Sequence, residues 1–255
     1  MTSKRKQQIY NLLKGIETGD PKSVEVVNES KYIQHNPQTR EGSIGLAELF
    51  KRLSQSSPRV NIVRIFEDGD YIFAHTEYDF SNSNIGFEVF RFENDQAVEH
   101  WDNIQQRKDP NPAGHSMVDG ETKVTDLNKT EANRLVVQTF IDEVLINHRL
   151  DKLSNFIDAQ NYTEHNPSMD DSLSMLMSAL SSGTSDNGSS ITYKKNHRLL
   201  AEGCFVLSVS EGEQNGVHSS FYDLFRLDGS MIVEHWDTTE PVPPQSEWKN
   251  SNGKF

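Results

Sequence analysis

Two histidine–aspartate pairs stand at the same spacing in this sequence. His100 and Asp102 lie in a Val-Glu-His-Trp-Asp segment, and the same five residues return around His235 and Asp237. Alternate side chains of an extended strand share a face, so each histidine would face the same side as its aspartate, roughly 7 Å away. A carboxylate in an apolar pocket is a base near neutral pH, and an imidazole can protonate a carbonyl oxygen. The pairs therefore suit acid–base chemistry on one small substrate.

A further carboxylate falls on a neighbouring strand of each pair. Asp223 stands between two aromatic residues on one strand face, and its counterpart is Glu88. A carboxylate on an aromatic face needs either a partner or a function. Pairing with an arginine such as Arg226 or Arg198 is the structural alternative to a role in catalysis.

Histidines also follow a tyrosine in two similar hexapeptides, Tyr-Ile-Gln-His-Asn-Pro and Tyr-Thr-Glu-His-Asn-Pro. These histidines are either turn residues or groups at the mouth of a pocket. The candidate catalytic residues are therefore His35, Glu88, His100, Asp102, His165, Asp223, His235 and Asp237. The candidate substrate-binding residues are Tyr32, His75, Phe90, Trp101, Tyr162, Phe221, Phe225 and Trp236. Among these, the two tryptophans also suit packing, and His75 has only Val209 as its counterpart.

The order of these motifs indicates an internal duplication. His165 follows His35 by 130 positions (165 − 35), and His235 follows His100 by 135 (235 − 100). A longer Ser/Gly/Asn-rich loop at 181–188 accounts for most of the difference. We expect one domain at 1–107, a polar linker at 108–129 that is neither strand nor strong helix, a second domain at 130–244, and a tail at 245–255 that is extended and mobile at its end.

Periodicity predicts the same elements in each copy. In the first, we expect helices at 6–16, from 20 onward and at 43–56, and strands at 60–67, 70–80, 85–93 and 96–105. In the second, we expect helices at 130–148, 151–159 and 170–181, and strands at 191–201, 204–211, 217–227 and 231–238. Helices followed by an antiparallel meander are typical of the α+β class.

The motifs just described resemble those of the SnoaL-like polyketide cyclase family, in the nuclear transport factor 2-like superfamily, once per copy. The segment 111–120 also resembles one that follows the last strand in some relatives. The resemblance implies two tandem cone-shaped α+β barrels, each with three helices on a curved, mostly antiparallel sheet and a cavity between them. It also implies pairing through the sheets, so that the chain would be a pseudo-dimer by itself, with further homo-oligomers possible.

Composition excludes several classes of partner and site. A net charge of −13 disfavours binding to nucleic acid, and the single cysteine, Cys204, excludes an internal disulfide or a cysteine-based zinc site. The sequence has no run of about 18 apolar residues, so no membrane partner is expected and the expected location is the cytoplasm.

The leading hypothesis is a small-molecule enzyme of the isomerase, lyase or cyclase type that works without a cofactor. Its substrate would be an apolar molecule with a C–H beside a carbonyl, with Asp237 or Asp223 as base and His235 assisting. The second copy is favoured because its Phe-Tyr-Asp-Leu-Phe-Arg strand fits the family best. A binding module without catalysis and a structural assembly domain with filled cavities are the alternatives. A metal centre built from His35, His75, His100 and Asp102 is a further alternative, although the spacing fits no known ligand signature.

Overall fold

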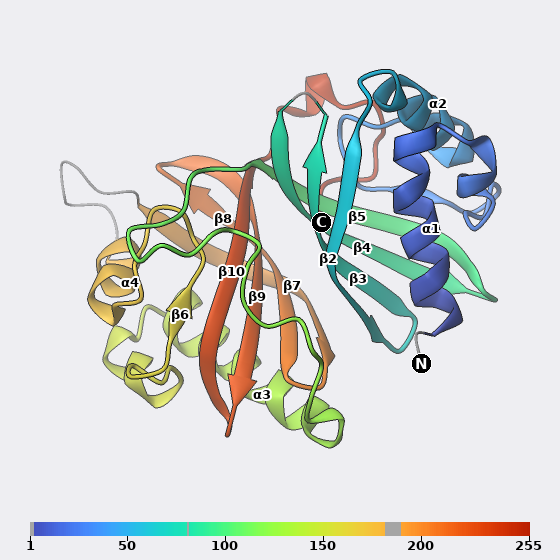
Figure 1. The fold of residues 1–255 in the computed structure, drawn as a ribbon. Coiled ribbons are helices and arrows are strands. Elements are labelled where there is room, and N and C mark those ends of the chain that lie inside the picture. The colour runs from blue at the N-terminus through green and yellow to red at the C-terminus, as the bar shows by residue number, and fades with distance from the viewer. Residues whose placement is uncertain (1–2, 81, 182–189) are drawn as a thin grey trace. The chain divides into compact units, whose positions relative to one another are not determined.

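The chain folds into two units that each contain one five-stranded sheet (Figure 1). The structure is a computed structural model, and it describes residues 3–80, 82–181 and 190–255. The first unit comprises residues 1–107 and 242–255, and the second comprises residues 108–241. Most of the loop expected at 181–188 lies outside the described residues.

The first unit begins with helices and ends with a meander. Its helical elements are α1 (Lys4–Thr18), the 3₁₀ turn η1 (Pro21–Val24), α2 (Gly42–Ser54) and, in residues 242–255, the 3₁₀ turn η5 (Gln245–Glu247). Its strands are β1 (Ile33–Gln34), β2 (Arg59–Asp68), β3 (Tyr71–Asp79), β4 (Ser83–Glu93) and β5 (Gln96–Gln106).

The sheet of this unit has the order β1-β5-β4-β3-β2. β2 to β5 are antiparallel, whereas the two-residue β1 pairs in parallel with β5. The apolar stripe of α1, with Ile9, Leu12 and Ile16, is buried in one core cluster with Phe50 of α2 and Phe90 of β4. Burial of this stripe, rather than helix propensity alone, stabilises α1 against the sheet.

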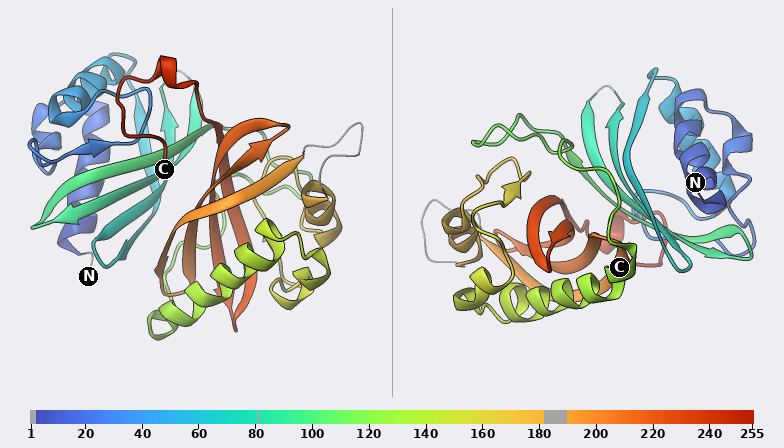
Figure 2. Two further views of the ribbon diagram at one scale, coloured as in Figure 1. Left: turned by 180° about the vertical axis from the view of Figure 1, so that it is seen from behind. Right: turned by 60° about the horizontal axis from the view of Figure 1, so that its bottom comes forward.

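The second unit repeats the plan. Its helical elements are the 3₁₀ turn η2 (Leu127–Lys129), α3 (Thr130–Phe140), which continues as the π-helical η3 (Ile141–Ile146), the 3₁₀ helix η4 (Leu150–Asn155) and α4 (Leu173–Leu180). Its strands are β6 (Thr163–Glu164), β7 (Ile191–Glu202), β8 (Phe205–Gln214), β9 (Val217–Asp228) and β10 (Met231–Pro241). The order β6-β10-β9-β8-β7 matches that of the first sheet, and α3 lies across one face of it (Figure 2).

The structure confirms the α+β class and the eight predicted meander strands, and it corrects the helices. The segment after Asp20 is a single 3₁₀ turn of four residues. The Asp20 side chain caps its start by accepting a hydrogen bond from Lys22 N–H. The helix expected at 151–159 is likewise 3₁₀ and ends at Asn155. Among the described residues, no helix is long and apolar enough to cross a membrane.

The two connecting segments are integral parts of the units. Residues 108–129, expected as a linker, belong to the second unit. Residues 242–255 belong to the first unit, although the sequence predicts 242–244 as the end of the second domain and 245–255 as a tail with a mobile end. The end is fixed because Asn250 and Asn252 donate hydrogen bonds to backbone carbonyls of residues 34, 36 and 39, and Lys254 is 2% exposed. The segment that follows the last strand of each copy is thus built into the other unit.

Candidate functional site

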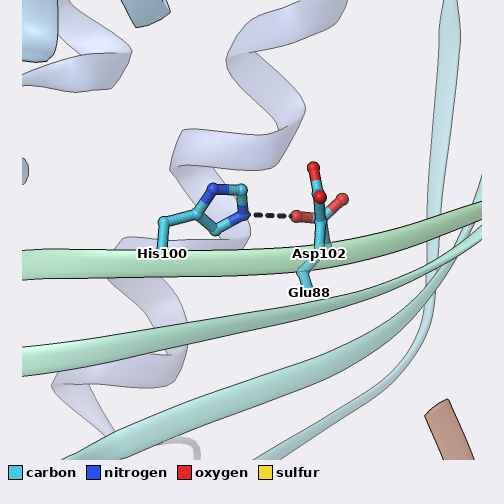
Figure 3. A group of neighbouring side chains, drawn as sticks. All are labelled: Glu88, His100 and Asp102. Atoms are coloured by element: carbon cyan, nitrogen blue, oxygen red, sulfur yellow. Dashed lines mark hydrogen bonds and ion pairs between the residues drawn. The ribbon is translucent and has the colours of Figure 1, made fainter. Parts of the chain in front are cut away.

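A cavity of about 200 Å³ lies in the first unit between the helices and the sheet. Side chains of α1 and α2, such as Leu12, Leu46 and Phe50, form its apolar wall. Glu88, His100 and Asp102 line it from the sheet side and gather into one cluster (Figure 3). All three residues are at least nine-tenths buried.

Strand register brings the cluster together. Glu88 of β4 lies opposite Asp102 of β5, and Phe90 lies opposite His100. On the other side of β5, the parallel register of β1 places Gln34 beside His100. Since alternate residues share a face, Glu88, His100 and Asp102 all face the cavity.

Hydrogen bonds define where the protons lie. Gln34 Oε1 accepts from Asn36 N–H at 2.8 Å and lies 2.9 Å from His100 Nδ1, so Nδ1 carries a hydrogen and donates it. His100 Nε2 lies 2.7 Å from Glu88 Oε2, and Tyr78 O–H donates to Glu88 Oε1 at 2.6 Å. A single proton is therefore shared between the imidazole and the carboxyl group.

Burial shifts the pKa of Glu88, the acid of this pair. Desolvation raises the pKa of Glu88 above its ordinary value, although the hydrogen bond and charge of His100 oppose the rise. Burial, followed by the charge of Glu88, raises the pKa of Tyr78 well above its ordinary value. Tyr78 is therefore a neutral donor to the Glu88 carboxyl group.

Asp102 has separate partners. Asn36 Nδ2 donates to Asp102 Oδ2 at 2.6 Å, and Lys254 Nζ lies 3.5 Å from Asp102 Oδ1. Both Asp102 and Lys254 are buried. A buried carboxylate is costly without a counter-charge, and Lys254 provides one.

Glu88, His100 and Asp102 are also the residues of this site that could hold a metal ion, since their ligand atoms lie within 4.8 Å of one another. The ammonium group of Lys254 lies beside one of these oxygens and would repel a divalent cation. The four-residue centre considered from the sequence does not form, because His35 and His75 lie on the opposite face of the sheet. There His35 stacks on Trp101 and His75 stacks on Phe87.

The second unit builds a related cluster with one decisive change. Glu164 of β6 occupies the position of Gln34, in the same parallel register beside His235. His235 Nδ1 lies 2.9 Å from Glu164 Oε1, and Nε2 lies 3.3 Å from Asp223 Oδ1. Carboxylates therefore face both ring nitrogens of His235, which can donate to both only as imidazolium.

The charges of this second cluster are correspondingly fixed. Burial alone would lower the pKa of His235, but the charge of Glu164 and hydrogen bonds to Asp223 and Glu164 raise it well above its ordinary value. Burial would raise the pKa of Glu164, but His235 lowers it. Asp237 receives Asn166 Nδ2 at 2.7 Å, and burial raises its pKa to about 7.

Space also differs between the copies. The cavity against Asp223, His235 and Asp237 has a volume of about 30 Å³. A water molecule needs roughly 10–15 Å³ measured in this way, so this cavity holds water and no organic substrate. The preference for the second copy drawn from its sequence pattern is therefore not matched by the cavities.

The structure brings most of the predicted residues to the two cavities and leaves several out. Those that line a cavity are Glu88, Phe90, His100, Asp102, Tyr162, Asp223, Phe225, His235 and Asp237. Phe221 packs against Tyr193 behind the lining, and Tyr32 is buried beside the first cluster without lining its cavity.

His35 and His165 are corrected from catalytic candidates to structural anchors. His35 bonds Gly253 O and Glu99, whereas His165 bonds Ser116 O and Glu234. They stack at 4.7 Å on Trp101 and Trp236, which face away from the cavities by strand alternation. Arg226 pairs with Glu234 rather than with Asp223.

Sequence reasoning missed four contributors to the first site. Gln34 and Asn36 flank the histidine of the Tyr-x-x-His-Asn-Pro motif, so alternation about that histidine was the available signal. Tyr78 lies on the same face of β3 as Thr76 and Ala74, which strand alternation also indicates. No local signal in the sequence marks Lys254.

Comparisons with known proteins found similar structures of low sequence identity. No protein-family model and no curated protein matches the chain. Solved structures that are similar include TsrD from Streptomyces laurentii, with 16% identity, a TM-score of 0.36, and coverage of 41% of this chain and 92% of that one. IdmH from Streptomyces antibioticus, a candidate polyketide cyclase, has 13% identity, a TM-score of 0.36 and coverage of 40% and 93%.

A third similar structure is an NTF2-like protein of unknown function from Cytophaga hutchinsonii, with 11% identity, a TM-score of 0.36 and coverage of 41% and 93%. Each of the three proteins matches about two-fifths of this chain.

Proposed function

We propose that the first unit is a small-molecule enzyme site that performs acid–base chemistry with its own side chains. The substrate is a compact, largely apolar compound with an acidic C–H beside a carbonyl. The observation that carries the proposal is the cavity of about 200 Å³ onto which a proton-sharing Glu88–His100 pair and a second carboxylate open together. Its volume lies below the roughly 300–1,000 Å³ of pockets for drug-sized ligands, which restricts the substrate to a small molecule.

In the proposed reaction, Asp102 takes the proton from carbon while the shared proton of the Glu88–His100 pair moves to the carbonyl oxygen. For a β,γ-unsaturated carbonyl compound, the resulting dienol returns its hydroxyl proton to the Glu88–His100 pair and takes the proton held by Asp102 at its γ-carbon. Where the β-carbon carries a hydroxyl group instead, the enol returns its proton to the pair and expels that group, which leaves as water with the proton from Asp102. The first route is an isomerisation and the second an elimination. Tyr78 stabilises negative charge on Glu88 after the transfer by its hydrogen bond.

Hydrogen–deuterium exchange at carbon tests this proposal before the natural substrate is known. A panel of small ketones and enones is incubated with the protein in D₂O, and loss of the α-proton signal is followed by NMR. We expect exchange above the buffer rate for compounds that fit the cavity. D102N and E88Q should each lower that rate by about 10²–10⁴-fold, the usual contribution of general acid–base catalysis.

The matched variant in the second unit is D237N. Exchange that survives D237N and is lost in D102N supports the first unit as the site. Exchange lost in D237N and kept in D102N would move the activity to the second copy. Compounds that bind to the wild-type protein without any exchange would instead support a binding module of the same fold.

A further inference from the structure

The segment 249–255 contacts several residues that build the site of the first unit. Asn252 Nδ2 donates to the backbone carbonyl of Gln34 at 3.0 Å, and the carbonyl of Gly253 lies 2.9 Å from His35 Nδ1. Asn250 Nδ2 donates to the carbonyls of Asn36 and Thr39 at 2.7 and 3.0 Å. The segment therefore binds the hexapeptide that contains Gln34, the hydrogen-bond partner of His100, and Asn36, the partner of Asp102.

These backbone contacts deliver one charged side chain into the interior. Lys254 is 2% exposed, and its Nζ lies 3.5 Å from Asp102 Oδ1. Desolvating an ammonium group is unfavourable unless a carboxylate compensates for it. The backbone grip and the burial of Lys254 together indicate a built position rather than a surface contact.

The second unit offers a comparison in which, among the described residues, no lysine pairs with the corresponding aspartate. Asp237 occupies the place of Asp102 and keeps the equivalent asparagine, Asn166. Its other oxygen, Oδ1, has no hydrogen-bond partner among the described residues. Burial raises the pKa of Asp237 to about 7, the charge of His235 opposes the rise, and the charges of Glu164 and Asp223 add to it. The buried lysine is therefore a feature of the first unit, where it faces a carboxylate with the same kind of asparagine partner.

We propose that the segment 249–255 completes the site of the first unit and that Lys254 is a positioning residue which keeps Asp102 ionised in the apolar cavity. This inference rests on the proposed function for its catalytic meaning, but its electrostatic content does not depend on any activity. The titratable groups that face Asp102 are Tyr32, Tyr78, Glu88, His100 and Lys254. Lys254 is the one permanent cation in this set, because the histidine shares its proton with Glu88.

The test follows the Asp102 carboxyl carbon by NMR in protein labelled with ¹³C-aspartate, with D102N used to assign the signal. K254M removes the charge and keeps most of the side-chain volume. We expect the titration midpoint of Asp102 to rise by at least one pH unit in K254M. K249M, which changes an exposed lysine of the same segment, should leave the midpoint where it is in the wild-type protein.

Activity gives a separate readout. If the proposed reaction occurs, the acidic limb of its pH–rate profile should move upward in K254M together with the NMR midpoint, with about a tenfold loss of kcat/KM at pH 6. A midpoint that moves without any detectable reaction keeps the role of Lys254 and removes the proposed function. A midpoint identical in wild-type, K254M and K249M proteins overturns the inference, whether or not the protein is active.

Discussion

The two histidine clusters differ in the group that faces the histidine Nδ1. Gln34 offers His100 a neutral amide oxygen, whereas Glu164 offers His235 a carboxylate. His100 therefore lies against one carboxyl group, Glu88, whereas His235 lies between two. Burial lowers the pKa of His235, but these two carboxylates raise it well above its ordinary value, so the imidazolium is favoured.

Changing Glu164 to glutamine should therefore release His235. In E164Q we expect the pKa of His235 to fall from its raised value, because the charge and hydrogen bond of Glu164 contribute to the rise. The Cε1–H signal of His235 reports the titration by NMR. E213Q, which changes a partly exposed residue of β8, is the control, and an unchanged His235 titration in E164Q would contradict this account.

At the scale of residues, the sequence identifies the ionisable side chains of the site better than the side chains that hydrogen-bond to them. His100, Asp102 and Glu88 are predicted because strand alternation in a four-strand meander is a strong signal. Gln34 is missed because β1 is two residues long and shows no periodicity. Its side chain reaches His100 through a parallel pairing of segments 66 positions apart, which no local pattern encodes.

At the scale of elements, short edge strands connect the sheets to their closing segments. In the first unit, Asn252 bonds the carbonyl of Gln34 on β1. In the second, Asn111 bonds the carbonyl of Glu164 on β6 at 2.7 Å. The following histidine, His35 or His165, then bonds a carbonyl of the same closing segment. On one face of the sheet, the hexapeptide motif therefore binds the closing segment. On the other face, it contributes side chains to the histidine cluster.

Removing the histidine that anchors a closing segment should increase the mobility of that segment. His165 has a fully buried side chain that stacks on Trp236 and contacts Ser116 O, Asp119 and Glu234. H165A leaves those partners unpaired, so we expect a loss of about 2–3 kcal/mol of stability in the second unit. Amide hydrogen exchange of residues 111–121 should quicken most. H218A changes an exposed histidine of β9, and equal effects of the two variants would contradict the anchoring role.

The elements themselves show where periodicity suffices. The predicted meander strands match the structure to within a few residues, because a clear turn follows most of them. Burial does not alternate along β3, β4, β8, β9 and β10, which are buried over consecutive residues. Short helices were less predictable, because capping and backbone geometry convert η1 and η4 to 3₁₀ form. The unit that residues 108–129 and 242–255 each join is determined by tertiary contacts with residues distant in the sequence.

For the whole molecule, the buried carboxyl group of Asp237 in the second unit makes the free energy of unfolding depend on pH. Asp237 has an ordinary pKa of 3.8 and a folded pKa of about 7, so the folded state binds the extra proton between these values. Stability then falls as pH rises from about 4 to 7, and the penalty is complete above pH 7.

D237N should remove this penalty. We expect D237N to be more stable than wild type by roughly 2–4 kcal/mol at pH 8, at about 1.4 kcal/mol per pKa unit, and to show little gain at pH 4. Denaturant titrations at both pH values measure the difference. D228N alters an exposed aspartate of β9 as the control, and a D237N gain that is equal at both pH values would contradict the linkage.

The pairing of the two copies as a pseudo-dimer stays a prediction. What is already fixed is their connectivity, since each unit includes the segment that follows the last strand of the other copy. Residues 1–107 without 242–255 would lack Lys254 and the grip on the Gln34 hexapeptide.

This exchange of closing segments has a consequence for deletions. Where two tandem domains are each made of one continuous segment, one can be deleted while the other keeps all of its residues. Here a deletion of residues 130–255 would also remove 242–255 from the first unit, and a deletion of residues 1–129 would remove 108–129 from the second. Neither half of the chain therefore contains a whole unit.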